Sequence, residues 1–91
     1  MTSAFSKRYE HFRRLIVQAR KSAGVTQVQL ARRLGKPQSF VSKYELGERR
    51  LDIIEFLDVA AALGVKPEAF VRKLLHDRRG GGILGDEDRR G

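Results

Sequence analysis

The chain of 91 residues contains no cysteine, which excludes disulfides, thiolate zinc sites and a cysteine nucleophile. It also has no long apolar run. The longest stretch made only of apolar residues and glycine, residues 59–65, is far shorter than the ~20 residues that a membrane span needs. Residues 1–12 do not resemble a signal peptide. We therefore expect a cytoplasmic protein that does not associate with membranes.

Catalytic constellations are missing as well. The two histidines, His11 and His76, lie far apart in the sequence and have no metal-ligand spacing. Glu10 and Glu68 are not arranged as an acid/base pair, and the glycines at 80–82 follow no predicted strand and precede no predicted helix. A chain this short buries only about 60–65% of its unfolded surface, which leaves little room for an interior active site. We expect no enzyme activity, no cofactor and no metal.

Positive charge is abundant and unevenly distributed. The chain has 19 Lys and Arg against 11 Asp and Glu, for a net charge of +8. Residues 1–50 carry a net charge of +9, and residues 51–91 carry −1. A basic half of this kind is expected of a surface that meets nucleic acid, although a basic soluble protein without that function would show it too.

Helical periodicity runs from residue 6 to about residue 76, and no segment alternates as a strand does. The pattern predicts an all-α domain over residues 1–77, with helices at about 7–23, 27–34, 37–46, 52–63 and 67–76. Glycines end most of them, and Thr26 is a suitable N-cap for the second. The predicted core residues are Tyr9, Phe12, Ile16, Ala19, Ala23, Leu30, Ala31, Leu34, Val41, Tyr44, Ile53, Phe56, Val59, Ala60, Leu63, Phe70 and Leu74.

Residues 78–91 differ in composition, since three consecutive glycines are followed by a run of charged residues. We expect a flexible tail there. Its only apolar residues, Ile83 and Leu84, are either part of a frayed end or a small docking element.

The third predicted helix has an unusual outer side, formed by Gln38, Ser39, Ser42 and Lys43. These side chains are polar and of modest length, whereas an ordinary exposed helix face is rich in Glu and Lys. A glutamine amide can pair with adenine through two hydrogen bonds, and a lysine can donate to guanine. Each residue alone also fits a solvated surface position, but together, in a basic half-chain, they favour DNA.

With these features, the chain resembles the lambda-repressor-like helix-turn-helix proteins of the Cro/Xre type. The resemblance covers about residues 8–76 and rests on the spacing T-Q-x-x-L-A-x-x-x-G followed by S-x-x-E-x-G, with residues 23–27, Gln38, Val41, Ala60 and 63–65 matching in addition. It implies a compact five-helix domain in which the second and third helices form the DNA-reading unit. The third helix, at about 37–46, then lies in the major groove.

The resemblance also implies roles for single residues. Gln38, Ser39 and Lys43 fall where the family reads bases, with Ser42 nearby, and Gln27 falls where it touches a phosphate. Arg20 and Glu45 match a structural ion pair, and Arg20 is aimed at a phosphate too. The residues implied in backbone contacts are Thr26, Gln27, Lys36, Arg49, Arg50 and Arg20.

Two positions depart from the family pattern. Lys36 and Pro37 stand where the family has an apolar residue followed by Ser or Thr, so the usual side-chain cap of the third helix is lost. Phe40 occupies an outward position that is commonly small or polar. We expect its ring to pack on thymine methyls or sugars, and the alternative is that it folds back onto the neighbouring loop.

A single domain of this kind buries only about 600–1,000 Å² on DNA, so tight binding is expected to need a homodimer on a palindromic operator. Ile54, Leu57, Val71 and Leu75 lie off the predicted core stripes and are the candidate dimer interface. The function expected is a sequence-specific regulator that binds double-stranded DNA, acting as a repressor. One alternative is an antitoxin-type module that binds a partner protein through its tail and autoregulates through DNA. RNA binding is the third, weakened by the few surface aromatics.

Overall fold

The structure, a computed structural model, describes residues 6–76. They form five helices: α1 (Lys7–Ser22), α2 (Gln27–Leu34), α3 (Gln38–Leu46), α4 (Ile53–Leu63) and α5 (Pro67–His76). No strand occurs in this range, so the all-α prediction is confirmed. The tail predicted at 78–91, with Ile83 and Leu84, lies outside the described residues.

Short polar side chains cap the N-termini of α1, α2 and α4, and glycines are the C-caps of α2, α3 and α4. The side chains of Thr26 and Asp52 accept a hydrogen bond from the backbone N–H of the third residue of α2 and α4. The backbone N–H of each cap donates in return to the side chain of that third residue, so both helices start with a complete capping box. Pro37 precedes α3 with no side-chain hydrogen bond, as its sequence departure predicted. Gly35, at φ +68°, lets the chain leave α2 in the left-handed conformation and turn directly into α3.

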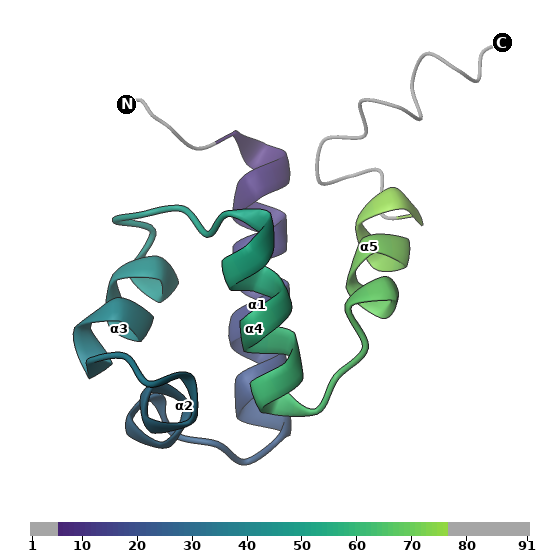
Figure 1. Cartoon of the computed structure of the whole chain (residues 1–91). Helices are drawn as coiled ribbons and strands as arrows, with labels where there is room; N and C mark the ends of the chain where they lie inside the picture. The colour runs from purple at the N-terminus through teal and green to yellow at the C-terminus, as the bar shows by residue number, and fades with distance from the viewer. Residues whose placement is uncertain (1–5, 77–91) are drawn as a thin grey trace, which may run out of the picture.

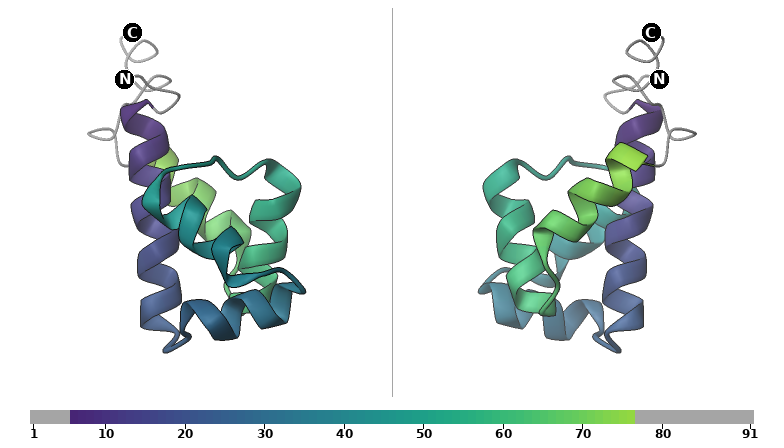
Figure 2. Two further views of the ribbon diagram at one scale, coloured as in Figure 1. Left: turned by 90° about the vertical axis from the view of Figure 1, so that its left-hand side faces the viewer. Right: turned by 90° about the vertical axis from the view of Figure 1, so that its right-hand side faces the viewer.

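The helices form a layered bundle. Figure 1 shows α3 and α5 on opposite sides of α1 and α4, and the two side views of Figure 2 agree, with α3 in front on one side and α5 on the other. Helix α2 packs on both α3 and α4, and α5 packs on α1 and α4. The outer side of α3 is thereby left without a covering helix.

Apolar side chains from all five helices meet in one core. The most deeply buried are Ile16, Leu30, Val41, Tyr44 and Val59. Phe56 joins the two ends of the core, because its ring lies 5.3 Å from that of Phe12 and 5.5 Å from that of Phe70, both at steep angles. This core fixes α3 through its inward residues Val41 and Tyr44.

Two predicted core residues are wrong. Ile53 is 63% exposed, because it is the first residue of α4 and its side chain lies outside the core stripe. Leu51, in the loop before α4, is buried instead. Ala23 is exposed because it is the C-cap of α1, and Val25 takes the buried place two residues later.

Candidate nucleic-acid interface

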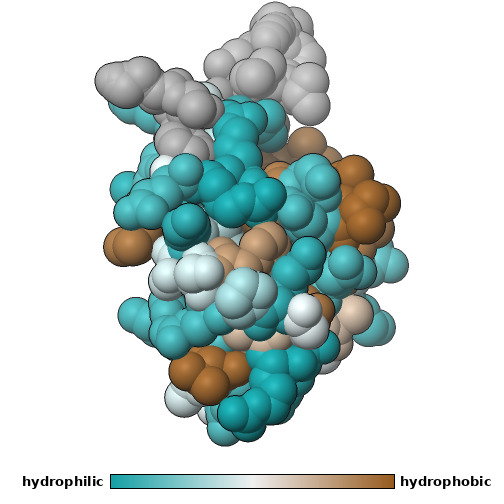
Figure 3. Space-filling view, turned by 60° about the vertical axis from the view of Figure 1, so that its left-hand side comes forward, coloured by the Kyte–Doolittle hydropathy of each residue, from teal (hydrophilic) through white to brown (hydrophobic). Residues whose placement is uncertain are grey.

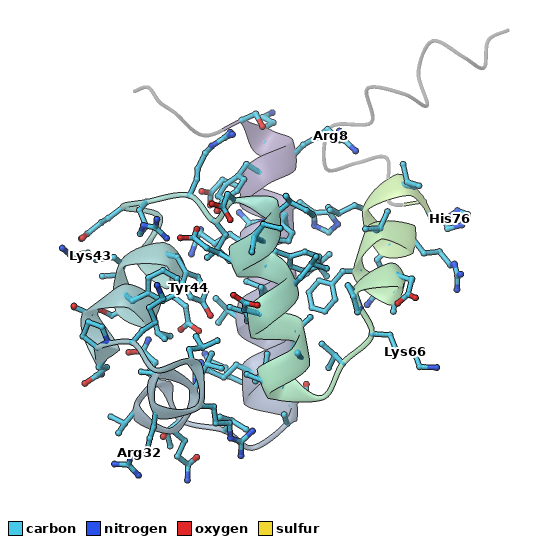
Figure 4. The ribbon with its side chains drawn as sticks, in the orientation of Figure 1. Arg8, Arg32, Lys43, Tyr44, Lys66 and His76 are labelled. Carbon is cyan, nitrogen blue, oxygen red and sulfur yellow. The ribbon has the colours of Figure 1, made fainter. Side chains whose placement is uncertain are left out.

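Helices α2 and α3, joined at Gly35, present a polar outer surface. Gln38, Ser39 and Lys43 of α3 are exposed, and Ser42 is half-buried with its hydroxyl donating to the Ser39 carbonyl oxygen at 3.3 Å. Figure 4 shows Lys43 on the outer side of α3. Figure 3, in which the side that carries α3 is turned forward, shows a mostly hydrophilic surface with scattered hydrophobic side chains. The four side chains predicted to meet bases thus lie together on one accessible helix face.

Behind this face, a chain of hydrogen bonds links α1 to the start of α3. Arg20 of α1 donates to both carboxylate oxygens of Glu45, from Nε at 2.7 Å and from Nη2 at 2.9 Å. Gln27 Nε2 donates to the same Glu45 carboxylate at 2.9 Å, and Gln38 Nε2 donates to Gln27 Oε1 at 3.2 Å. The Arg20–Glu45 ion pair that the resemblance implied is therefore present, and it extends through Gln27 to Gln38.

This chain sets the polarity of the Gln38 amide. The side-chain NH₂ group of Gln27 donates to Glu45, so the side-chain carbonyl oxygen of Gln27 is the atom that faces Gln38. Gln38 donates to this oxygen with one N–H of its own NH₂ group. Its Oε1 then remains available to accept a hydrogen bond from a ligand, and its second N–H remains available to donate one. One acceptor and one donor side by side are what the major-groove edge of adenine requires.

Glu45 is an acidic residue held at the back of a basic surface. It is 8% exposed, and a buried charge is tolerated when it is paired and fully hydrogen-bonded. The hydrogen bonds to the Glu45 carboxylate raise the pKa of the Arg20 guanidinium further above its usual range. Arg20 Nη1 also donates to the Val25 carbonyl oxygen at 2.8 Å, which ties the turn before α2 to α1.

Arg13 supports the same region from two turns earlier in α1, although no sequence pattern pointed to it. Its Nη1 donates to the Glu45 carbonyl oxygen at the end of α3, and its Nη2 pairs with Glu10 at 2.7 Å. The end of α3 is thus held by two arginines of α1, one on the Glu45 side chain and one on its backbone.

Phe40 corrects a sequence-based expectation. Its ring is half-buried, lies 5.6 Å from the ring of Tyr44 and packs against the core, so it takes the second alternative and folds back. The cationic groups of Lys36 and Arg49 lie over it, at 5.2 and 4.9 Å from its centroid. Phe40 therefore orients two basic residues beside α3 and does not project toward bases.

The other residues predicted to contact the DNA backbone differ in their interactions within the protein. Arg49 makes two hydrogen bonds of 3.1 Å to the carboxylate of Glu55, so much of its charge is satisfied within the protein. Arg50 is exposed, with its guanidinium 4.5 Å from the centroid of Tyr9. The Thr26 hydroxyl accepts from the Gln29 N–H as an N-cap, which leaves the first N–H groups of α2 without partners inside the helix.

Comparisons with known proteins agree with this arrangement. A model of the helix-turn-helix family matches residues 16–70, a span that includes α2, α3 and α4. A solved structure described as an XRE-family like protein, from Pseudomonas syringae pv. tomato str. DC3000, is 54% identical, with a TM-score of 0.72 over 74% of this chain and 82% of that one. The chain belongs to the Cro/Xre-type helix-turn-helix family. A search of curated proteins returned no match.

Membership places the chain among DNA-binding regulators, a family that binds double-stranded DNA and is generally non-enzymatic. The helix-turn-helix of this chain consists of α2 and α3, which the turn at Gly35 joins within the matched span. Within residues 6–76 the structure contains no helix that is long and apolar enough to cross a membrane. In the same range, no cluster of three or more His, Asp or Glu side chains is placed to hold a metal ion.

Three of the four predicted dimer residues lie together at the junction of α4 and α5 of this Xre-type domain. Ile54, Leu57, Val71 and Leu75 are all exposed. Leu57, Val71 and Leu75 line one mainly apolar hollow of about 670 Å³ between α4 and α5, while Ile54 is not among its lining residues. The structure thus gathers three of the four into one surface.

A second hollow, of about 480 Å³, lies between α1 and the ends of α2 and α3, and no sequence-based inference pointed to it. Its walls include Arg13 and Arg20 but also Arg14 and Lys21, two exposed residues of α1. The only signal in the sequence is their spacing of seven, which places both on one side of a helix.

Proposed function

We propose that this chain is a sequence-specific transcriptional regulator that represses by occupying a double-stranded operator, with α3 in the major groove. The observation that carries the proposal is the hydrogen-bond chain from Arg20 through Glu45 and Gln27 to Gln38. It fixes the amide of an exposed residue in one orientation. Such ordering has little use on a solvated surface, but it lowers the entropic cost of a two-bond contact with adenine.

Lys43 and Ser39 complete the base-reading set. Lys43 lies five residues after Gln38 on the exposed side of α3 and can donate to guanine, and the small Ser39 allows the helix to approach the groove closely. Ser42 is half-buried and bonded to the Ser39 carbonyl, so its contribution is smaller.

Phosphates on either side of α3 are proposed to meet two groups of contacts. On one side lies the N-terminus of α2, where free N–H groups and the helix dipole favour an anion beside Gln27 and Thr26. On the other side lie Lys36, Arg49 and Arg50. These contacts position the protein and carry no sequence information.

A homodimer completes the proposal. The apolar hollow lined by Leu57, Val71 and Leu75 is the proposed interface, because burying it removes apolar surface from water and leaves α3 of each protomer uncovered. Two-fold symmetry then requires a palindromic site with its half-sites about 34 Å apart. The antitoxin alternative depends on residues 78–91, outside the described part of the chain, and no contact of the described residues favours it.

Selection of bound sequences from a random duplex pool, at about 150 mM salt, tests the proposal. The expected result is a palindrome with a two-fold axis between half-sites. Recovery of no shared motif, together with binding that disappears as salt rises, would show non-specific attraction only and reject sequence reading.

A further inference from the structure

We propose that a strip along α1, formed by Arg14, Gln18 and Lys21, binds the phosphate backbone of the same duplex beyond the base-reading helix. This inference rests on the proposed function and adds a second DNA-binding surface to it. The strip lies in the hollow of about 480 Å³ between α1 and the ends of α2 and α3. Its members are spaced at four, three and seven residues, so they share one side of α1.

Arg14 and Lys21 are the two basic residues of the hollow that have no acidic partner in an ion pair within the described part of the chain. Four basic residues line it, but Arg13 is paired with Glu10 and Arg20 with Glu45, at 2.7 Å each. The side chains of Arg14 and Lys21 are exposed and make no ion pair or hydrogen bond among the described residues, although the charge of Arg14 helps to lower the pKa of Glu10. The excess positive charge of the hollow is therefore theirs, and an anion can bind both without first breaking a contact.

The hollow is continuous with the surface that meets DNA. Arg20, Gln27 and Glu45 line it and are also members of the hydrogen-bond chain that ends on Gln38. Figure 2, in its left view, shows α1 alongside α3 on the face that carries α3. A strand whose phosphate sits at the N-terminus of α2, beside Gln27, therefore passes next to α1.

The dimensions and walls of the hollow suit a DNA strand. From Arg14 to Lys21 the helix rises about 10 Å, at 1.5 Å per residue, which corresponds to about three phosphates of one strand along the duplex axis. Leu46, at the end of α3, is 69% exposed and lines the same hollow. An exposed leucine between arginines fits the apolar face of a deoxyribose, which lies between successive phosphates.

The test compares full-length wild-type protein with two double variants that each lose two positive charges. Arg14→Gln with Lys21→Gln removes the strip. Arg8→Gln with Lys66→Gln, which also removes one arginine and one lysine, is the matched control, because Figure 4 shows both residues on the side of the molecule away from α3. Binding to the selected duplex and to a scrambled duplex of the same length is followed by fluorescence anisotropy over a range of salt concentrations. Far-ultraviolet circular dichroism checks that all three proteins fold.

For each bound protomer, the strip variant should lower the slope of log affinity against log salt by about two units and should weaken binding roughly 30-fold at 0.15 M salt. The loss should be equal on both duplexes, and the variant should select the same motif as wild type. Neutral methylphosphonates, placed singly around the site, should include positions that weaken the wild type but not the strip variant.

A strip variant whose slope equals that of the wild type, or falls no more than that of the control pair, overturns the inference while the selected motif keeps the proposed function intact. If the wild type selects no motif, the proposed function fails, and the strip as its extension fails with it.

Discussion

Arg20 and Glu45 join α1 to α3 through two hydrogen bonds, of 2.7 and 2.9 Å, between a guanidinium and a carboxylate that are both largely shielded from solvent. The pair holds the recognition helix against the bundle. It also fixes Gln27, which accepts a hydrogen bond from Gln38. One contact thus joins α1 to α3 and, through Gln27, orients Gln38, the side chain proposed to read a base.

Replacing Arg20 with alanine should destabilise the protein as well as weaken DNA binding. The change strands the buried Glu45 carboxylate, which typically costs about 3–5 kcal/mol for a fully buried pair and somewhat less here. Urea denaturation measures it, and the double variant Arg20→Met with Glu45→Leu should recover much of the loss in stability without recovering binding. A single variant with unchanged unfolding but impaired binding would make Arg20 a DNA contact only.

Replacing Gln27 with alanine should reduce base discrimination at a position that Gln27 does not touch. The variant removes the acceptor that orients Gln38, a loss on the order of 1 kcal/mol of preference for the correct base pair. Competition binding between the selected duplex and its single-base-pair variants measures this. Gln18→Ala, in the strip of α1 proposed to meet the DNA backbone, is the control. It should keep full discrimination whatever its affinity, because backbone contacts carry no sequence information. Equal discrimination by both variants would remove Gln27 from the reading mechanism.

Introducing a charge at Leu57 should yield monomers. Leu57 lines the apolar hollow between α4 and α5, so Leu57→Glu would bury an unpaired carboxylate in the proposed interface. Sedimentation equilibrium should give a dimer for the wild type and for Val28→Glu, an exposed position on α2, but a monomer for Leu57→Glu. A dimer that persists in Leu57→Glu would place the interface elsewhere.

Low pH should reduce the free energy of unfolding, partly through protonation of Glu55. Hydrogen bonds from Arg49, followed by that from the Asp52 N–H, lower the pKa of Glu55 below its ordinary 4.5. A carboxyl group with a lowered folded pKa stabilises the protein above its unfolded pKa, and this contribution is lost as pH falls through the folded value. Glu55→Gln should therefore lower stability at pH 7, by less than about 1 kcal/mol for a pair this exposed. Its stability should then change less between about pH 5 and pH 3 than that of the wild type. Parallel acid limbs in urea titrations would contradict this assignment.

Much of the fold follows from local signals in the sequence. Thr26, Gly35 and Pro67 begin or end helices where their backbone preferences predict, and the apolar spacing gave most of the core. Ile53 was misplaced because periodicity cannot tell a first-turn residue from a core residue. Leu51 was missed because it lies in a loop, where periodicity gives no information.

The candidate site was predictable in part, and for a different reason. The residues proposed to face bases share one helix face, which their spacing reveals, and the resemblance supplied the Arg20–Glu45 pair. The fold-back of Phe40 depends on Arg49, Lys36 and Tyr44, and the support of α3 by Arg13 joins residues 32 apart in the chain. Such contacts arise only when α1 and the loop after α3 are placed in space.

The most direct test of the account is the affinity of wild type and Gln38→Ala for the selected duplex and for every single-base-pair variant of it. The account predicts that Gln38→Ala loses about 1–3 kcal/mol on the selected duplex and loses its preference at one base pair per half-site, keeping the others. An equal loss on every duplex would show that Gln38 contributes only general affinity, and would contradict the claim that the chain from Arg20 to Gln38 serves base reading.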